Sequence, residues 1–243
     1  MLIIIFGREE EAKIASITEA VLSEFPEVVS LFHIINPKNN SSFYDLEPIH
    51  IHGDPFLKES LGSVEYKIGP KSFFQTNTRQ AEKLYSIARD FADIQAGDNV
   101  YDLYTGLGSI ALYIADKCKS VVGIEEIEEA IVWARENAKH NQIENSTFYA
   151  GDVKDLLTDD FVEKHGRADI IITDPPRMGM HKEVVEMFLK LESPKIVYIS
   201  CNPATQARDI GLLSEKYTLE KIQAVDMFPH THHVESVALL KLK

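Results

Sequence analysis

The chain has 243 residues, of which 44% are hydrophobic and 26% charged, as is typical of a soluble globular protein that needs no disulfide or metal to hold its core. Its two cysteines, Cys118 and Cys201, do not suggest a disulfide framework and fit a reducing cytoplasm. A secretory signal and an apolar run of membrane-spanning length are both lacking, so we expect a cytoplasmic location and no membrane partner. The formal net charge of −13 argues against nucleic-acid binding on charge alone.

The first 72 residues mix strand and helix patterns and are predicted to form a small α+β subdomain. Strand-like runs are expected at 2–6, 28–35, 48–52 and 63–69, with a helix at 9–24 and a turn at 36–42.

The remaining part, residues 73–243, alternates short β-branched runs with helical segments after a first helix at 78–91. Strands are expected at 99–104, 120–125, 146–150, 169–173, 195–200, 217–225 and 234–242, and helices at 108–117, 127–140, 181–191 and 204–215. This pattern predicts an α/β fold with a parallel sheet covered on both faces. Because no helix joins the last two strands, they are expected to form an antiparallel edge pair. The seven-strand outline is typical of a Rossmann-like class I methyltransferase domain.

A nucleotide-binding turn is predicted in NVYDLYTGLGSIALYIA, residues 99–115. Gly106 and Gly108 allow a tight turn and close approach of a ligand to the backbone. The helix that begins near Ser109 offers free N–H groups to an anionic group such as a carboxylate. By itself the pattern also fits an ordinary strand-to-helix turn.

Two acidic residues follow at the ends of the next two strands. Glu125 lies nineteen residues after Gly106, where doubly wound nucleotide sites place a carboxylate on ribose hydroxyls. Asp152 is expected to accept a hydrogen bond from an adenine amine. The alternatives are a helix-start charge for Glu125 and an N-cap for Asp152. Since Ala111 breaks a G-x-G-x-x-G pattern and no Walker A lysine is present, S-adenosylmethionine is favoured over a dinucleotide or ATP.

The next two strands end in Asp174 and Cys201. Because these strands are predicted to be neighbours, both side chains are expected at the edge where open α/β sheets bind ligands. Asp174 opens the loop DPPRMG, residues 174–179. Related D-P-P-Y loops occur in amino-methyltransferases that act on adenine, and Arg177 in place of the aromatic residue argues against that chemistry.

A thiol beside a methyl donor has a clear chemical use. When a thiolate adds to C6 of a pyrimidine, C5 gains enolate character and can attack a methyl sulfonium. A base must then remove the C5 proton, and Glu235, beside the final strand, is the candidate. The simpler alternatives are an inert core thiol for Cys201 and a solvated strand-edge charge for Glu235.

Five segments, in this order, resemble motifs of the RNA uracil-5 methyltransferase family: SFFQTN (72–77), YDLYTGLGSIAL (101–112), DPPRMG (174–179), SCNPATQARD (200–209) and DMFPHTHHVES (226–236). The resemblance extends from about residue 60 to the C-terminus. It implies that Cys201 attacks C6 and that Glu235 accepts the C5 proton. It also implies that Gln75, Tyr104, Glu125 and Asp174 lie at the donor or base pocket.

The predicted donor site therefore comprises Gln75, Tyr104, Gly106, Gly108, Ser109, Glu125, Asp152 and Asp174. At the position of Ser109, some family members carry Asn. Gln75 as a cap of the helix near Asn77, and Arg208 paired only with Asp209, are the alternatives without a role in the site. The run HTHH at 230–233 lacks the companions of a zinc site, so no metal is expected.

The chain departs from the family at its N-terminal side. Many members carry an oligonucleotide-binding barrel there, and some a four-cysteine iron–sulfur cluster, neither of which is expected in this sequence. A trimmed form, a natural short form and a piece of a longer product all remain open. The acidic balance fits the loss of a basic RNA-binding part.

The predicted function is S-adenosylmethionine-dependent methylation of C5 of a uridine in structured RNA, with ribosomal RNA, and hence rRNA processing, preferred over transfer RNA. The base would have to leave its stack to reach the site. One alternative is a cytosine-5 methyltransferase, although such enzymes usually carry Pro where Ser200 precedes the cysteine. Another is a truncated, non-catalytic module that binds the donor or RNA.

Overall fold

The computed structural model describes residues 1–43 and 45–243. They form two compact units, Met1–Glu59 with Tyr66–Ser72, and Ser60–Glu65 with Phe73–Lys243. Strands β4 (Leu57–Leu61) and β5 (Val64–Ile68) pair with each other. Within this pair, Ser60–Glu65 belongs to the larger unit and the residues on either side belong to the smaller one. A domain boundary at residue 72 stays a prediction.

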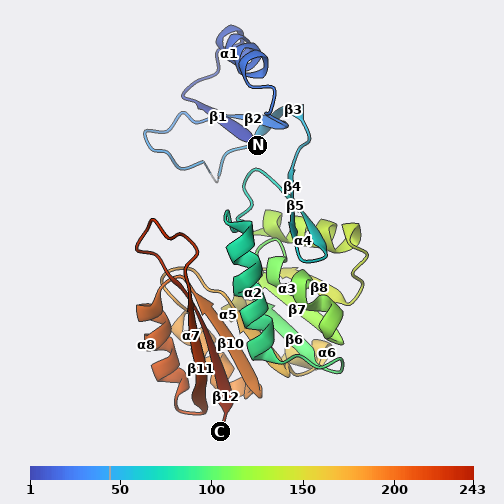
Figure 1. The fold of residues 1–243 in the computed structure, drawn as a ribbon, viewed down its shortest axis with the longest axis vertical. Coiled ribbons are helices and arrows are strands. Elements are labelled where there is room, and N and C mark those ends of the chain that lie inside the picture. Colours follow the sequence, from blue (N-terminus) through green and yellow to red (C-terminus); the bar gives the residue numbers. More distant parts are fainter. Residues whose placement is uncertain (44) are drawn as a thin grey trace. The chain divides into compact units, whose positions relative to one another are not determined.

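The smaller unit is a three-stranded sheet with one helix (Figure 1). Its elements are β1 (Leu2–Phe6), α1 (Glu11–Glu24), β2 (Ser30–Ile35) and β3 (Ile49–Gly53). β1 and β2 are parallel, which requires a crossover, and α1 supplies it. β3 is antiparallel to β2. These elements lie within a few residues of the expected ranges.

The larger unit is built on a seven-stranded sheet in the order β11-β12-β10-β9-β6-β7-β8. Its strands are β6 (Asn99–Leu103), β7 (Ser120–Glu125), β8 (Ser146–Ala150), β9 (Ile170–Thr173), β10 (Lys195–Ser200), β11 (Tyr217–Val225) and β12 (Glu235–Leu242). The central strands β6 and β9 are buried along their whole length, as parallel strands covered on both faces should be. The last strand, β12, lies between β10 and β11 and is antiparallel to both.

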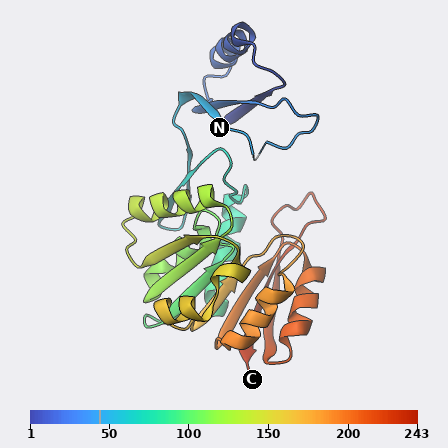
Figure 2. The same cartoon turned by 180° about the vertical axis from the view of Figure 1, so that it is seen from behind.

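Helices cover both faces of this sheet (Figures 1 and 2). One face carries α2 (Thr78–Ala92), α3 (Ser109–Ile114), which a short 3-10 turn (Ala115–Lys117) continues, and α4 (Glu128–His140). The other carries α5 (Val153–Leu156), α6 (Asp159–His165), α7 (Lys182–Leu191) and α8 (Pro203–Leu213), whose apolar side chains share one core with the strands. Among the described residues, no helix combines the length and the apolar character needed to cross a membrane.

Candidate active site

Strand pairing brings Cys201 and Glu235 together. β10 and β12 are antiparallel, and their last pair is Ser200 with Ser236. Continued by one residue, this register brings Cys201, just after β10, opposite Glu235, the first residue of β12, and the charge of Glu235 raises the pKa of the thiol. Directly opposed residues of antiparallel strands project to the same face, with Cβ atoms about 4.5–5.5 Å apart. Ala238 packs into the core under α5–α8. Because side chains alternate along a strand, Glu235 and its neighbour Cys201 face the opposite side, which α2 covers.

Asp174 reaches the same side of the sheet from β9. Thr173 lies opposite Tyr198 of β10 and Leu103 of β6. The side chains of Tyr198 and Leu103 belong to the core under α5–α8. Asp174 is one residue further along its strand, so alternation turns it toward α2, as it does Cys201, three residues after Tyr198.

Tyr85, a buried residue of α2, lies within electrostatic range of Asp174 and Glu235. Burial, followed by the charge of Asp174 and more weakly those of Asp102 and Glu235, raises the pKa of Tyr85. The Tyr85 hydroxyl lies 3.1 Å from the hydroxyl of Ser109, at the start of α3. Tyr85 thus contacts Ser109, a predicted donor-site residue, and lies close enough to Asp174 for that charge to raise its pKa.

The electrostatic environment of the cluster favours neutral side chains. Burial raises the pKa of the Cys201 thiol, and the charges of Glu235 and Asp174 raise it further, while Arg177 lowers it. Burial, with Glu235 and Asp102 nearby, raises the pKa of Asp174 well above its ordinary value. Burial also raises the pKa of Glu235. A carboxylate with a raised pKa is a stronger base, which suits proton abstraction.

The glycine turn adopts left-handed backbone conformations. Gly106 has φ +56° and Gly108 φ +83°, and Tyr104 shares this region with φ 66°. A Cβ added at Gly106 would meet no atom within 4 Å, whereas one at Gly108 would meet Phe148 and Ala134 at 3.2–3.3 Å. Gly106 therefore borders open space that a ligand can enter, and Gly108 allows the turn to pack closely.

Asp102, which the sequence analysis did not single out, stabilises this turn. It is fully buried, and its Oδ2 accepts hydrogen bonds from Thr105 Oγ1 at 2.5 Å and Ala111 N at 3.0 Å. Its Oδ1 is buried and has no partner among the described residues. Burial raises the pKa of Asp102 to about 7, with a contribution from Glu125. A donor group on a ligand in the turn would satisfy this oxygen.

Glu125 and Asp152 both make hydrogen bonds within the protein. Glu125 accepts from Gly106 N at 3.0 Å and from Ile127 N at 3.1 Å, so it links β7 to the glycine turn. Asp152 is the N-cap of α5, accepts from Lys154 N and forms an ion pair with the Lys154 side chain. The N-cap interpretation of Asp152 is thus confirmed, and its role toward an adenine amine stays a prediction.

Tyr104 lies on the opposite side of the sheet from the thiol. Its ring packs against the core under α5–α8. Burial and the charges of Asp152, Asp209 and Glu125 raise its pKa. The predicted residues therefore form two groups, one around the glycine turn and one around Cys201 under α2.

Gln75 precedes α2 and is buried, with 8% of its surface exposed. The N-cap of α2 is Asn77, whose side chain accepts from Gln80 N. The alternative that Gln75 caps this helix is therefore wrong.

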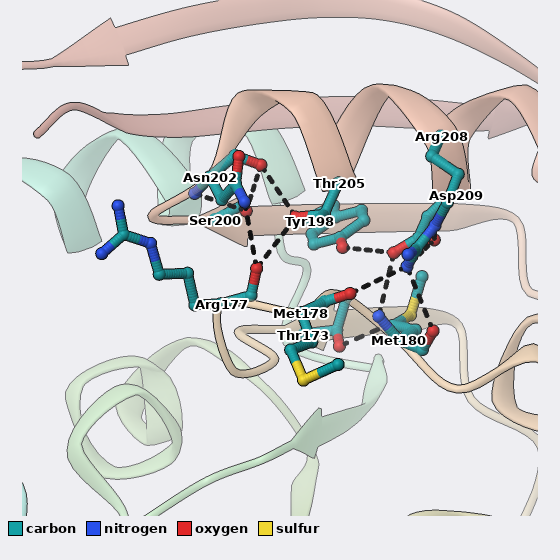
Figure 3. Close-up of polar contacts among 10 residues, drawn as sticks. All are labelled: Thr173, Arg177, Met178, Met180, Tyr198, Ser200, Asn202, Thr205, Arg208 and Asp209. Atoms are coloured by element: carbon teal, nitrogen blue, oxygen red, sulfur yellow. Dashed lines mark hydrogen bonds and ion pairs between the residues drawn. The ribbon is translucent and has the colours of Figure 1, made fainter.

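The loop after Asp174 is tied to α8, the helix that follows Cys201 (Figure 3). The carboxylate of Asp209, which is fully buried, accepts from Met180 N at 2.9 Å and from the Tyr198 hydroxyl at 2.7 Å. Arg208 pairs with Asp209, with 2.7 Å between Nη2 and Oδ1, but the alternative that the two pair only with each other is wrong. Arg208 also donates to the carbonyl groups of Met178 and Met180.

The middle of this loop is held at one carbonyl group. Arg177 O accepts from Asn202 Nδ2 at 3.2 Å and from Thr205 Oγ1 at 3.3 Å. Because Asn202 is the residue after Cys201, the loop that carries Asp174 and the segment that carries the thiol are joined directly (Figure 3).

We expect Gly179→Ala to destabilise the protein by about 1–3 kcal/mol, since Gly179 has φ +78°. A Cβ there would lie 2.5 Å from Arg208 Nη2 and 2.6 Å from Asp209 Oδ2. Urea denaturation measures the change in the free energy of unfolding. The control is Gly211→Ala in α8, where a Cβ meets nothing within 4 Å, so stability should stay equal or rise. Equal stability of both variants would contradict this account of the loop.

The pH dependence of Cys201 alkylation should reveal how neighbouring charges shift the pKa of the thiol. The pKa of the thiol is raised above its ordinary value of 9.0, so the rate with iodoacetamide should still be rising at pH 9. At pH 8, Glu235→Gln removes a negative charge and should speed the reaction, and Arg177→Gln should slow it, each by about two- to fivefold.

Mass spectrometry of the Cys201 peptide measures the alkylation rate, in a Cys118→Ser background. This background leaves Cys201 as the single cysteine of the chain. A plateau below pH 9, or equal rates for the two charge variants, would show that the thiol does not sense these groups.

The loop before Glu235 contains the histidines of the HTHH run. The rings of His232 and His233 are in contact with centroids 4.2 Å apart and a tilt of 41°, and Arg177 Nη2 lies 3.4 Å from His233 Nδ1. Within the described ranges 1–43 and 45–243, no group of three ligating side chains suits a metal ion. A structural role for His233 near the site agrees with its contact to Arg177.

Comparison with known proteins gives consistent results. The sequence model of the family described as tRNA (Uracil-5-)-methyltransferase matches residues 56–243. A protein of Porphyromonas gingivalis described as an uncharacterized RNA methyltransferase is 50% identical over 242 residues, 99% of this chain and 52% of that protein. One of the same description from Bacteroides thetaiotaomicron is 52% identical over 223 residues, 92% of this chain and 49% of that protein. The chain thus spans about half the length of these relatives.

Solved structures agree with the fold. The Pyrococcus abyssi tRNA (uracil-54, C5)-methyltransferase in complex with S-adenosyl-L-homocysteine has a TM-score of 0.75 and 34% identity, covering 90% of this chain and 52% of that chain. Trm5b from the same organism has a TM-score of 0.60 at 19% identity, which bears on the fold alone. The predicted fold class, a Rossmann-like seven-stranded sheet of the class I methyltransferase type, is confirmed.

Proposed function

Because the chain belongs to the tRNA (uracil-5-)-methyltransferase family, we propose that it carries the catalytic part of an S-adenosylmethionine-dependent enzyme that methylates C5 of a uridine in structured RNA. The observation that supports the proposal is the register of β10 and β12, whose continuation by one residue brings Cys201 to Glu235, together with the charges of Glu235 and Asp174 that raise the pKa of the thiol. A thiol, a base and a buried acid on one face are what methylation through a covalent adduct requires.

The donor would be held at the glycine turn. Three observations support this: the open space beside Gly106, the unpartnered Oδ1 of Asp102, and Glu125 at the end of β7. When bound there, S-adenosylmethionine would supply an electrophilic methyl group on a sulfonium. Hydrogen-bond acceptors at Glu125 suit ribose hydroxyls, and Asp152 and Ser109 complete the predicted set.

Cys201 acts first in the proposed mechanism. Its thiolate forms a bond from Sγ to C6, and the electrons of the C5–C6 double bond move toward the C4 carbonyl group to give an enolate. C5 would thereby become nucleophilic toward the methyl group that the donor would supply. The raised pKa of Cys201 means that only a small fraction is thiolate at pH 7, so a bound base or substrate must assist its ionisation.

Asp174 would assist by donating a hydrogen bond. Its raised pKa favours the protonated form, since burial and neighbouring carboxylates oppose its charge. A protonated carboxyl can stabilise a developing enolate oxygen, which a carboxylate would repel.

Glu235 completes the reaction. Its carboxylate takes the C5 proton, the electrons of the C5–H bond form the C5–C6 double bond, and the bond from C6 to Sγ breaks to return the thiolate. A raised pKa makes Glu235 a better acceptor for this proton.

The RNA class is the open part of the proposal. The preference for ribosomal RNA stays a prediction, while the solved relative is named for uracil 54 of transfer RNA. Mass spectrometry of 5-methyluridine in separated ribosomal and transfer RNA, from cells with and without the gene, tests both. Deletion of the gene is expected to remove one 5-methyluridine from one of the two RNA classes. An unchanged amount of 5-methyluridine in both classes would refute the proposal.

A further inference from the structure

Two side chains of the first turn of α2 hold the chain where β11 ends. Asn77 Nδ2 donates a hydrogen bond to Met227 O at 2.8 Å, and Gln80 Nε2 donates one to Asp226 O at 2.7 Å. Both bonds join residues about 150 positions apart in the sequence, so they fix one element to another. We call Asn77 and Gln80, with these two bonds, the α2 clamp.

The clamp holds the loop end of the hairpin that presents Glu235. Val225 and Glu235 form the last pair between β11 and β12, and Asp226 and Met227 follow immediately. On the other side of β12, pairing with β10 ends one residue earlier, at Ser236. Glu235 therefore lies at the end of a strand, where local opening is easiest unless other contacts prevent it.

The buried side chain of Met227 also helps to hold the start of the loop that follows β11. Its side chain is 1% exposed, while residues 229–233 of the same loop are exposed. The loop is thus anchored at its start, where the α2 clamp binds the carbonyl groups of Asp226 and Met227, the first two residues after β11.

The clamp bond of Asn77 is separate from its helix cap. Asn77 Oδ1 accepts from Gln80 N at 3.3 Å and caps α2, whereas Nδ2 makes the clamp bond. A substitution that keeps the acceptor and removes the donor changes the clamp without removing the cap. Asp, a good N-cap residue whose carboxylate only accepts, meets this condition.

We propose that Asn77 and Gln80 are positioning residues for proton removal by Glu235. The inference rests on the proposed function. The clamp keeps the end of β12 closed, so that the Glu235 carboxylate stays beside the C5 proton of the adduct on Cys201. In the step concerned, the C5–H bond breaks, the proton passes to Glu235, the C5–C6 double bond forms and the bond from C6 to Sγ breaks.

The test follows two events in one single-turnover reaction. RNA from gene-deleted cells grown with [5-³H]uridine is mixed with the protein from the complete gene and ¹⁴C-methyl S-adenosylmethionine. Carbon-14 in RNA measures methyl transfer, and tritium in water measures proton removal. Asn77→Asp and Gln80→Glu are expected to keep methyl transfer within about twofold and to slow tritium release about 10- to 100-fold, as a displacement near 1 Å does.

Ser86→Ala is the matched control, because Ser86 Oγ donates within α2 to Lys83 O and does not contact the loop. Its methyl transfer and tritium release should equal those of the wild type. The inference is overturned if both clamp variants release tritium at the wild-type rate, or if methyl transfer and tritium release fall together. Wild-type protein that does neither would instead refute the proposed function.

Discussion

Cys201→Ala is expected to abolish both methylation and the covalent complex with RNA. The wild-type protein should form a complex with RNA that contains 5-fluorouridine and should retain it through denaturing electrophoresis. Fluorine occupies the position of the C5 proton, so Glu235 cannot complete the elimination and the bond from Sγ to C6 persists. Without the sulfur, no adduct forms, and we expect methyl transfer to fall at least about 10³-fold.

The second cysteine provides the control for this experiment. Cys118 is also free and is buried in the core, where its thiol contacts Ala115 O. Cys118→Ala should cost some stability and leave the complex with 5-fluorouridine RNA intact. A complex of undiminished yield with Cys201→Ala, or none with wild-type protein and an RNA that it methylates, would exclude this nucleophile.

The central strands of the sheet were predictable because they are buried on both faces, and such strands are short β-branched runs, as in IIIT at 170–173. The sequence also marks the largely exposed edge strand β11 and the antiparallel strand β12. Polar or short elements carry a weaker signal. β4, LKESL, has three polar residues among five, and α5 is four residues long, so neither was predicted.

The neighbours in space were less accessible than the elements. No local pattern shows that β12 lies between β10 and β11, since this order depends on pairing between distant segments. The partnership of Cys201 with Glu235 was therefore inferred from chemistry and family resemblance, while the structure supplies the register that relates them. The sequence was sufficient to identify the two side chains, but their relative geometry required the structure.

Supporting residues were missed for a related reason. Asp102 carries a signal, because an acid inside the apolar strand NVYDL is unusual, but its bonds to the glycine turn cannot be seen there. From the sequence, Asn77 was given no role beyond marking the position near which a helix starts. Its second bond, to Met227 O, crosses 150 residues and has no local signature.

Glu235→Gln is expected to stop the reaction after methyl transfer. Gln has nearly the same size and can still fill the space opposite Cys201, but its amide cannot accept the C5 proton. The variant should therefore accumulate a methylated covalent adduct with ordinary RNA, and tritium release from [5-³H]uridine should fall about 10²- to 10⁴-fold.

The Glu235→Gln substitution should also change the pH dependence of tritium release. Burial raises the pKa of Glu235, so in the wild type the basic carboxylate is present above that pKa and is lost as the pH falls through it. Proton removal from the preformed adduct should slow accordingly on acidification, and in Glu235→Gln this dependence should disappear. The control is Glu220→Gln on β11, whose carboxylate pairs with Lys241 on β12. Wild-type tritium release by Glu235→Gln would assign proton removal to another group and would remove the reason for Glu235 to lie opposite the thiol.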